Sequence, residues 1–158
     1  MQTLKAFLLV GLLALGLQAA WAAPAVDSSA GTWKLNLDKS AFGSRHPPRS
    51  EVRTYTLTPK GTRVVITEVD QDGKKSVSRT LLTYDGKTHP VAGSANYDAA
   101  RTARISANET TADMLLKGKV VGSLRRVVSD DGKTLTMNMK LDKADGTQEM
   151  TMSVFDRQ

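Results

Sequence analysis

The amino-acid sequence predicts an all-β protein, a single antiparallel up-and-down β-barrel of nine or ten strands that follows a secretory leader. Apolar and polar residues alternate with a period of two in most segments after residue 30, and four Asp-Gly steps separate such segments. Alternation gives each strand one apolar face, and Asp-Gly pairs favour tight hairpin turns. Closure into a barrel hides the strand edges, whereas a two-sheet sandwich usually needs crossover connections that short turns do not provide.

The first 22 residues are typical of a signal peptide. Lys5 precedes an uncharged apolar run over residues 6–17, and Ala20-Trp21-Ala22 places small residues at the −3 and −1 positions of a cleavage site. The run is shorter than the about 20 apolar residues of a membrane span. We therefore expect cleavage after Ala22, a barrel domain over residues 23–158, and a periplasmic or secreted protein with no integral membrane segment.

The expected strands follow in order from the alternation and the turn signals, beginning at Gly31, beside Trp33. The expected strands are 31–38, 51–58, 62–70, 75–84, 87–91, 98–106, 109–116, 119–129, 133–142 and 147–156. Strand 87–91 is the least regular, because Pro90 has no N–H for a ladder hydrogen bond. Segments 40–50 and 92–98 break the alternation and are expected to be loops.

Charge and composition narrow the function classes. The whole chain carries a net charge of +6, to which Lys5 in the leader contributes one. The chain has no block of lysines and arginines, so a nucleic-acid partner is not expected. It also has no cysteine, which removes thiol chemistry and thiolate metal sites.

Both ends of the expected barrel resemble a known family. Gly31-Thr32-Trp33-Lys34-Leu35 resembles the opening of the intracellular fatty-acid-binding proteins and, more loosely, the Gly-x-Trp signature of lipocalins, and Val154-Phe155-Asp156-Arg157 is similar to the final strand of the former. Both families are calycins, which are ligand-holding β-barrels, and small exported lipocalin-like bacterial proteins of unknown role look closest. The resemblance implies that Arg157 lies across Trp33 near the closed end, where both ends of the domain meet.

The sequence also departs from the fatty-acid-binding proteins. That family inserts two helices after the first strand, but segment 40–50 is too short and contains Pro47-Pro48. Its Arg-x-Tyr pair, which holds the fatty-acid carboxylate, corresponds to Ser153 and Phe155 here. The resemblance therefore implies the fold but not the fatty-acid site.

A candidate ligand-binding residue lies in the apolar strand 119–129, which contains Arg125 and Arg126. Alternation points Arg126 inward, whereas the family's spacing, counted from Gly118, points Arg125 inward. An inward arginine needs a partner, either a ligand carboxylate or phosphate or an internal Asp or Glu. The residues expected to line the apolar part of the lumen are Leu135, Met137, Met139, Met150 and Met152.

Other chemistry has no support in the sequence. His46 and His89 have no partners at metal-ligand spacing, and no Gly-x-Ser-x-Gly nucleophile motif is present. We therefore expect no catalytic residues, no metal and no cofactor.

Two functions remain. The first is a non-enzymatic binding protein of the cell envelope. Its ligand is a small apolar or amphipathic molecule, and one form of this ligand carries an anionic head. The second is a filled barrel that contacts another envelope component through its basic surface or loop 40–50. A lumen below about 300 Å³ would favour the second, because ligand pockets are usually larger.

Overall fold

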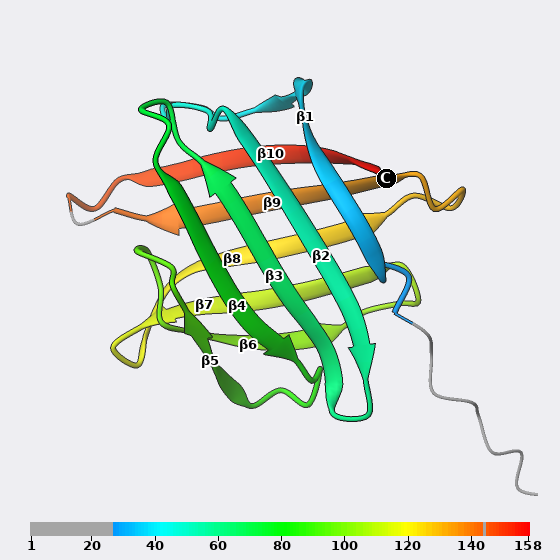
Figure 1. Ribbon diagram of the computed structural model, residues 1–158. Coiled ribbons are helices and arrows are strands. Elements are labelled where there is room, and N and C mark those ends of the chain that lie inside the picture. Colours follow the sequence, from blue (N-terminus) through cyan, green and yellow to red (C-terminus); the bar gives the residue numbers. More distant parts are fainter. Residues whose placement is uncertain (1–26, 144) are drawn as a thin grey trace, which may run out of the picture.

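The computed structural model describes residues 27–143 and 145–158. Over these residues ten strands form one closed antiparallel barrel, in which each strand pairs with its sequence neighbour and β10 pairs with β1 (Figure 1). The strands are β1 (Gly31–Ala41), β2 (Ser50–Thr58), β3 (Gly61–Val69), β4 (Lys75–Leu82), β5 (Thr88–Ala92), β6 (Ala99–Arg104), β7 (Glu109–Leu116), β8 (Lys119–Val128), β9 (Thr134–Asp142) and β10 (Gln148–Arg157).

This architecture confirms the predicted fold class, an all-β up-and-down barrel. Both ends of each strand lie within three residues of the expected positions, because the turn residues and the alternation indicate where a strand begins and ends. The predicted leader, residues 1–22, and its cleavage site lie outside the described residues. In the part of the chain that the structure describes, no helix has the length and apolar character to cross a membrane.

The main apolar cluster lies toward the end of the barrel at which β1 begins and β10 ends. Its fully buried members include Trp33, Leu135 and Phe155, which point inward from β1, β9 and β10. The remaining buried members of the cluster are Leu35, Tyr55, Val64, Val128 and Met137. Removal of these side chains from water stabilises this end, which is the closed end of the barrel.

A clamp between the first and last strands closes the barrel. The Trp33 indole N–H donates to the Ser29 carbonyl at 2.7 Å, and the Arg157 guanidinium lies over the indole, 4.1 Å from its centroid. Two Arg157 nitrogens donate to the carbonyls of Ala30 and Ser28 at 2.6 and 2.9 Å. Both the start of the described domain and its C-terminus therefore lie at the closed end.

Gly31 allows this clamp to form. Its φ of +128° lies in the region that favours glycine. A Cβ at this position would also lie 2.7 Å from a terminal nitrogen of Arg157. The Gly-x-Trp pattern therefore brings the backbone of β1 close to the last strand.

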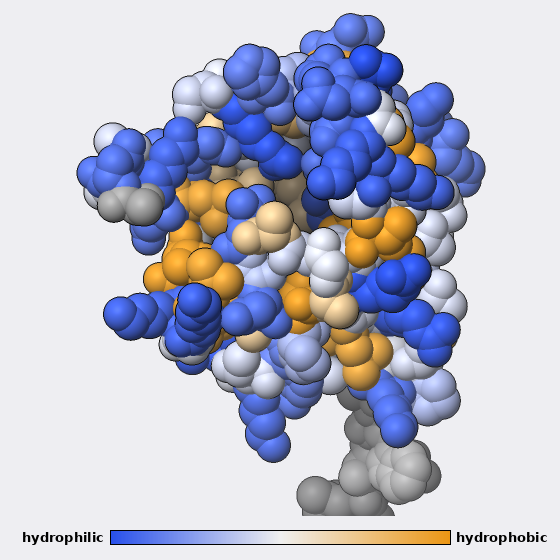
Figure 2. Space-filling view, turned by 60° about the vertical axis from the view of Figure 1, so that its left-hand side comes forward, coloured by the Kyte–Doolittle hydropathy of each residue, from blue (hydrophilic) through white to orange (hydrophobic). Residues whose placement is uncertain are grey.

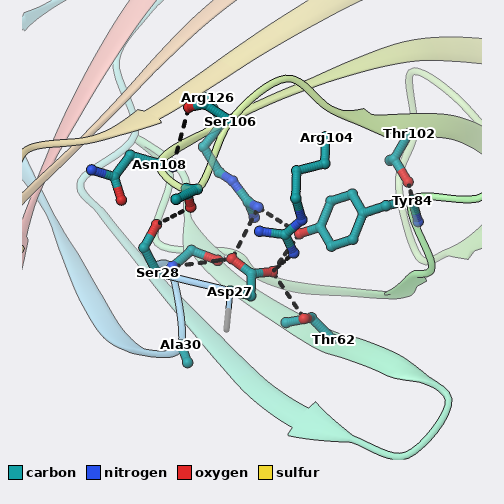
Figure 3. Close-up of polar contacts among 12 residues, drawn as sticks. Asp27, Ser28, Ala30, Thr62, Tyr84, Thr102, Arg104, Ser106, Asn108 and Arg126 are labelled. Carbon is teal, nitrogen blue, oxygen red and sulfur yellow. Dashed lines mark hydrogen bonds and ion pairs between the residues drawn. The ribbon is translucent and has the colours of Figure 1, made fainter. Parts of the chain in front are cut away.

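A buried polar network lies above the clamp, centred on Asp27 (Figure 3). The Asp27 carboxylate pairs with Arg126 at 3.4 Å and accepts hydrogen bonds from the hydroxyls of Thr62, at 2.9 Å, and Tyr84. Burial raises the Asp27 pKa, but the charge of Arg126 and the hydroxyl donors, including Ser29, outweigh it and lower the pKa to about 2. Asp27 is therefore a charged partner built into the closed end.

The seam between β4 and β5 is the shortest in the barrel. Only Arg79 with Ala92 and Thr80 with Val91 are paired across it, since Pro90 has no N–H to donate. At Gly93 the chain leaves the sheet, and segment 93–98 turns across the open end. This short pairing lets a loop rather than a strand border the mouth.

We predict that replacing Asp27 by Asn makes the protein less stable in a pH-dependent way. At neutral pH the variant leaves Arg126 buried without its counter-charge, which costs about 3 kcal/mol or more. The Asp27 pKa is lowered on folding, so its contribution is full above about pH 4 and disappears toward about pH 2. The difference in unfolding free energy between wild type and variant should therefore shrink by about 2 kcal/mol over this range.

Urea unfolding followed by circular dichroism at several pH values measures this difference. Asp38→Asn is the matched control, because Asp38 is exposed on the same β1 strand that follows Asp27. A difference for Asp27→Asn that stays constant from pH 5 to pH 2 would contradict the assigned charge.

Candidate ligand-binding site

The lumen contains two adjoining cavities. The inner one, of about 70 Å³, borders the core, and the outer one, of about 180 Å³, lies toward the open end. Both are lined by Arg53, Ile66, Ser78, Tyr97, Leu124 and Met137. Figure 2 shows the side of the molecule that carries the β9–β10 hairpin, where a recess lies among mainly hydrophilic residues.

The inner cavity is largely apolar. Its apolar lining includes Tyr55, Val64, Leu82, Val91, Met114 and Ala112. These side chains point inward from five strands, because they occupy the inner positions of each alternation. At the floor the cavity meets Tyr84 and Arg126, both of which already belong to the Asp27 network.

The outer cavity is polar and contains two ion pairs. The Arg53 Nε lies 2.5 Å from the Glu51 carboxylate, and an Arg45 terminal nitrogen lies 3.3 Å from Glu68. The hydroxyl-bearing residues around these pairs are Ser76, Ser78, Ser94, Tyr97, Thr151 and Ser153. Strand β2 supplies Glu51 and Arg53, whereas Arg45 comes from the segment between β1 and β2.

Arg53 stands at the junction of the two cavities. Its guanidinium lies over the Phe155 ring, 5.0 Å from the centroid. Burial lowers the pKa of the Arg53 guanidinium, but its neighbours, above all the Glu51 carboxylate, raise the pKa by more. The pKa therefore lies above its ordinary value, and the group stays charged. Burial raises the pKa of the nearby Tyr97 phenol, which therefore stays neutral.

The two candidate arginines lie on opposite faces. Arg126 is buried and points inward, as alternation predicts, and its partners are Asp27 and Tyr84. Arg125 is exposed on the outer face, where it pairs with Glu109 at 2.7 Å. The family spacing that placed Arg125 inward is therefore wrong here, and Arg126 has found an internal acid as its partner.

Of the residues expected to line the lumen, three are inside. Met137 lines both cavities and Met139 lines the outer one, whereas Leu135 is fully buried in the core below them. Met150 and Met152 are 69% and 39% exposed, so their placement in the lumen is wrong.

The register of β10 explains this error. Thr151 pairs with the inward Met139, and Ser153 pairs with the inward Met137. The inner face of β10 is therefore polar toward the open end, and its apolar alternation lies on the outside. Ser153, at the position of the family's carboxylate-binding arginine, borders the outer cavity instead.

Sequence reasoning missed the charged residues of the outer cavity. Glu51, Arg53 and Tyr55 recur at every second position of β2, which places them on one face. The opposite face carries Val52 and Thr54. Because neither face is plainly apolar, the pattern does not identify the inward one.

His89 of β5 contacts the β4–β5 connection and is not arranged as a catalytic relay. Its Nε2 contacts both the Thr83 hydroxyl, at 2.8 Å, and the Asp85 carboxylate, at 3.0 Å. A relay needs the hydroxyl and the carboxylate on opposite ring nitrogens. Among residues 27–143 and 145–158, no group of three His, Cys, Asp or Glu side chains is placed to hold a metal ion.

Comparisons with known proteins show similarity in structure. No protein-family model matches the chain. No curated protein sequence matches it either. The structure of zebrafish ileal bile acid-binding protein in complex with cholic acid is similar with a TM-score of 0.54 and 9% identity, over 83% of this chain and 99% of that one. A second match, the siderocalin Ex-FABP, has a TM-score of 0.41 and 13% identity, over 83% of this chain and 74% of the other.

At this identity the similarity concerns the fold. The zebrafish match extends over nearly its whole length, and the ten strands close in simple up-and-down order. The protein therefore has a calycin-type β-barrel fold.

Proposed function

We propose that the protein is a non-enzymatic binding protein that holds one small amphipathic molecule in its lumen. The observation that carries this proposal is the pair of adjoining cavities, one apolar and deep, the other polar and at the mouth. An amphipathic ligand can place its apolar part in the first and its polar group in the second. The zebrafish protein is complexed with cholic acid, which supports the proposal by analogy of fold alone.

The size of the cavities limits the ligand. At about 30 Å³ for each water molecule of the liquid, the 70 Å³ inner cavity accepts roughly two water-sized groups. A long acyl chain does not fit there without rearrangement of the core. The proposed ligand is therefore small, with a short apolar part.

The same cavity sizes favour a second candidate function. Each cavity is below the about 300 Å³ at which ligand pockets usually begin. On the outer face, a groove of about 530 Å³ is bordered by the exposed Met150 and Met152 and by the cationic Arg125 and Lys140. This groove supports contact with another envelope component as the alternative.

We propose that the protein acts outside the cytoplasm after cleavage of residues 1–22. The support is the leader pattern of the sequence. Intact-mass measurement of the protein from its native host should give the mass of a chain that begins at Ala23. A mass that includes the leader would overturn this part of the proposal.

We predict that Ser78→Phe prevents ligand binding. Ser78 points into both cavities from β4, so a phenyl ring there fills the junction between them. Native mass spectrometry of protein purified from its host should show a bound small molecule for wild type and at least about tenfold lower occupancy for the variant.

Ser123→Phe is the matched control, because Ser123 is exposed on the outer groove and does not border the lumen. It should retain the bound molecule. Loss of the molecule in Ser123→Phe, with retention in Ser78→Phe, would favour the outer groove over the lumen.

A further inference from the structure

Two glutamates face each other inside the barrel. Glu51 of β2 and Glu68 of β3 are direct partners in the antiparallel register, and both border the outer cavity. Side chains at such positions lie about 5 Å apart at Cβ, and like charges there are unfavourable. The pair therefore creates a place where positive charge is stabilised.

Two arginines offset these glutamates, so the cavity carries no excess of either charge. Arg53 pairs with Glu51, and Arg45 pairs with Glu68. A ligand with only a negative group would be repelled by the two carboxylates. A ligand with only a positive group would be repelled by the two guanidinium groups. A ligand that carries both signs avoids either repulsion.

Arg53 is the arginine suited to a ligand carboxylate. Its ion pair with Glu51 uses Nε, which leaves the terminal nitrogens to other acceptors, of which the Tyr55 phenol is one. Two parallel N–H donors are the arrangement that binds a carboxylate in a bidentate way. Arg126 is less suited, because Asp27 and the Tyr84 hydroxyl already occupy its terminal nitrogen Nη2.

The apolar cavity begins where Arg53 ends. Arg53 lines both cavities, so a group bound to it lies beside the entrance to the inner one. The inner cavity, of about 70 Å³, limits the apolar part of the ligand to a short alkyl side chain.

We propose that the ligand is a small zwitterion with a short apolar side chain, of which an apolar α-amino acid is the simplest form. This inference rests on the proposed binding function. The carboxylate binds the terminal nitrogens of Arg53, the ammonium lies between Glu51 and Glu68, and the side chain enters the inner cavity. Arg53 and the two glutamates are then the residues that determine specificity.

Calorimetric titration with leucine and two analogues, each of which lacks one of its charged groups, tests the charge requirement. The probes are L-leucine, 4-methylpentanoate, which lacks the ammonium group, and 3-methylbutylamine, which lacks the carboxylate. At pH 7 we expect leucine to bind at least about tenfold more tightly than either single-charge probe.

Variants of the glutamates test the assignment. Glu51→Gln and Glu68→Gln should each weaken leucine binding about fivefold or more and leave 4-methylpentanoate binding equal or stronger, because a negative charge is removed. Glu109→Gln is the matched control, since Glu109 pairs with an arginine on the outer face. Circular dichroism checks the fold of each variant, and if Glu51→Gln does not fold, Glu68→Gln, in a more exposed ion pair, decides the test.

The outcomes separate this inference from the function on which it rests. Equal affinities for the three probes, or leucine binding that neither glutamate variant changes, would overturn the zwitterion and leave lumen binding intact. If none of the probes binds, the zwitterion is overturned as well, and if native protein also carries no molecule, the binding function itself fails.

Discussion

The ion pair of Asp27 and Arg126 decides how the rest of the interior is organised. A buried guanidinium without a partner is very costly, and Asp27 provides that partner from a segment that precedes the first strand. Thr62, Tyr84 and Ser29 donate hydrogen bonds to Asp27. Arg104 lies 3.9 Å from the same carboxylate, and its Nη1 is buried without a hydrogen-bond partner among the described residues. The network therefore serves as the floor of the lumen, and binding chemistry is left to the side chains nearer the mouth.

The strand order could be predicted from the sequence because it depends on local signals. Period-two alternation and Asp-Gly turns are properties of a few neighbouring residues, and they determine where each strand begins and ends. Which face points inward depends on the whole barrel. In β10, the outer Met150 and Met152 are more apolar than the inner Thr151 and Ser153, so the usual rule gave the wrong face.

The candidate site was predictable only in part. Alternation in the apolar strand β8 identified Arg126, but its partner Asp27 is 99 residues away and follows no periodic pattern. The pairing of Glu51 with Glu68, in contrast, could be predicted from the sequence. The tight turn at residues 59–60 determines the register of the whole β2–β3 hairpin. Pairing the residues of β2 and β3 outward from this turn therefore predicts that Glu51 and Glu68 are opposite each other.

The segment between β1 and β2 contributes to the mouth in place of a lid. Its Arg45 reaches Glu68, and Gly43 lies so close to β10 that a Cβ would contact the Met150 carbonyl at 2.8 Å. The segment is therefore held by the strands that it joins and faces. Arg45 and Glu68 are about one-third exposed, whereas Glu51 is buried, so the outer ion pair is the more screened and the more easily opened of the two. The charges of the mouth are thus graded in depth, with an outer ion pair close to solvent and an inner ion pair in the buried part of the cavity.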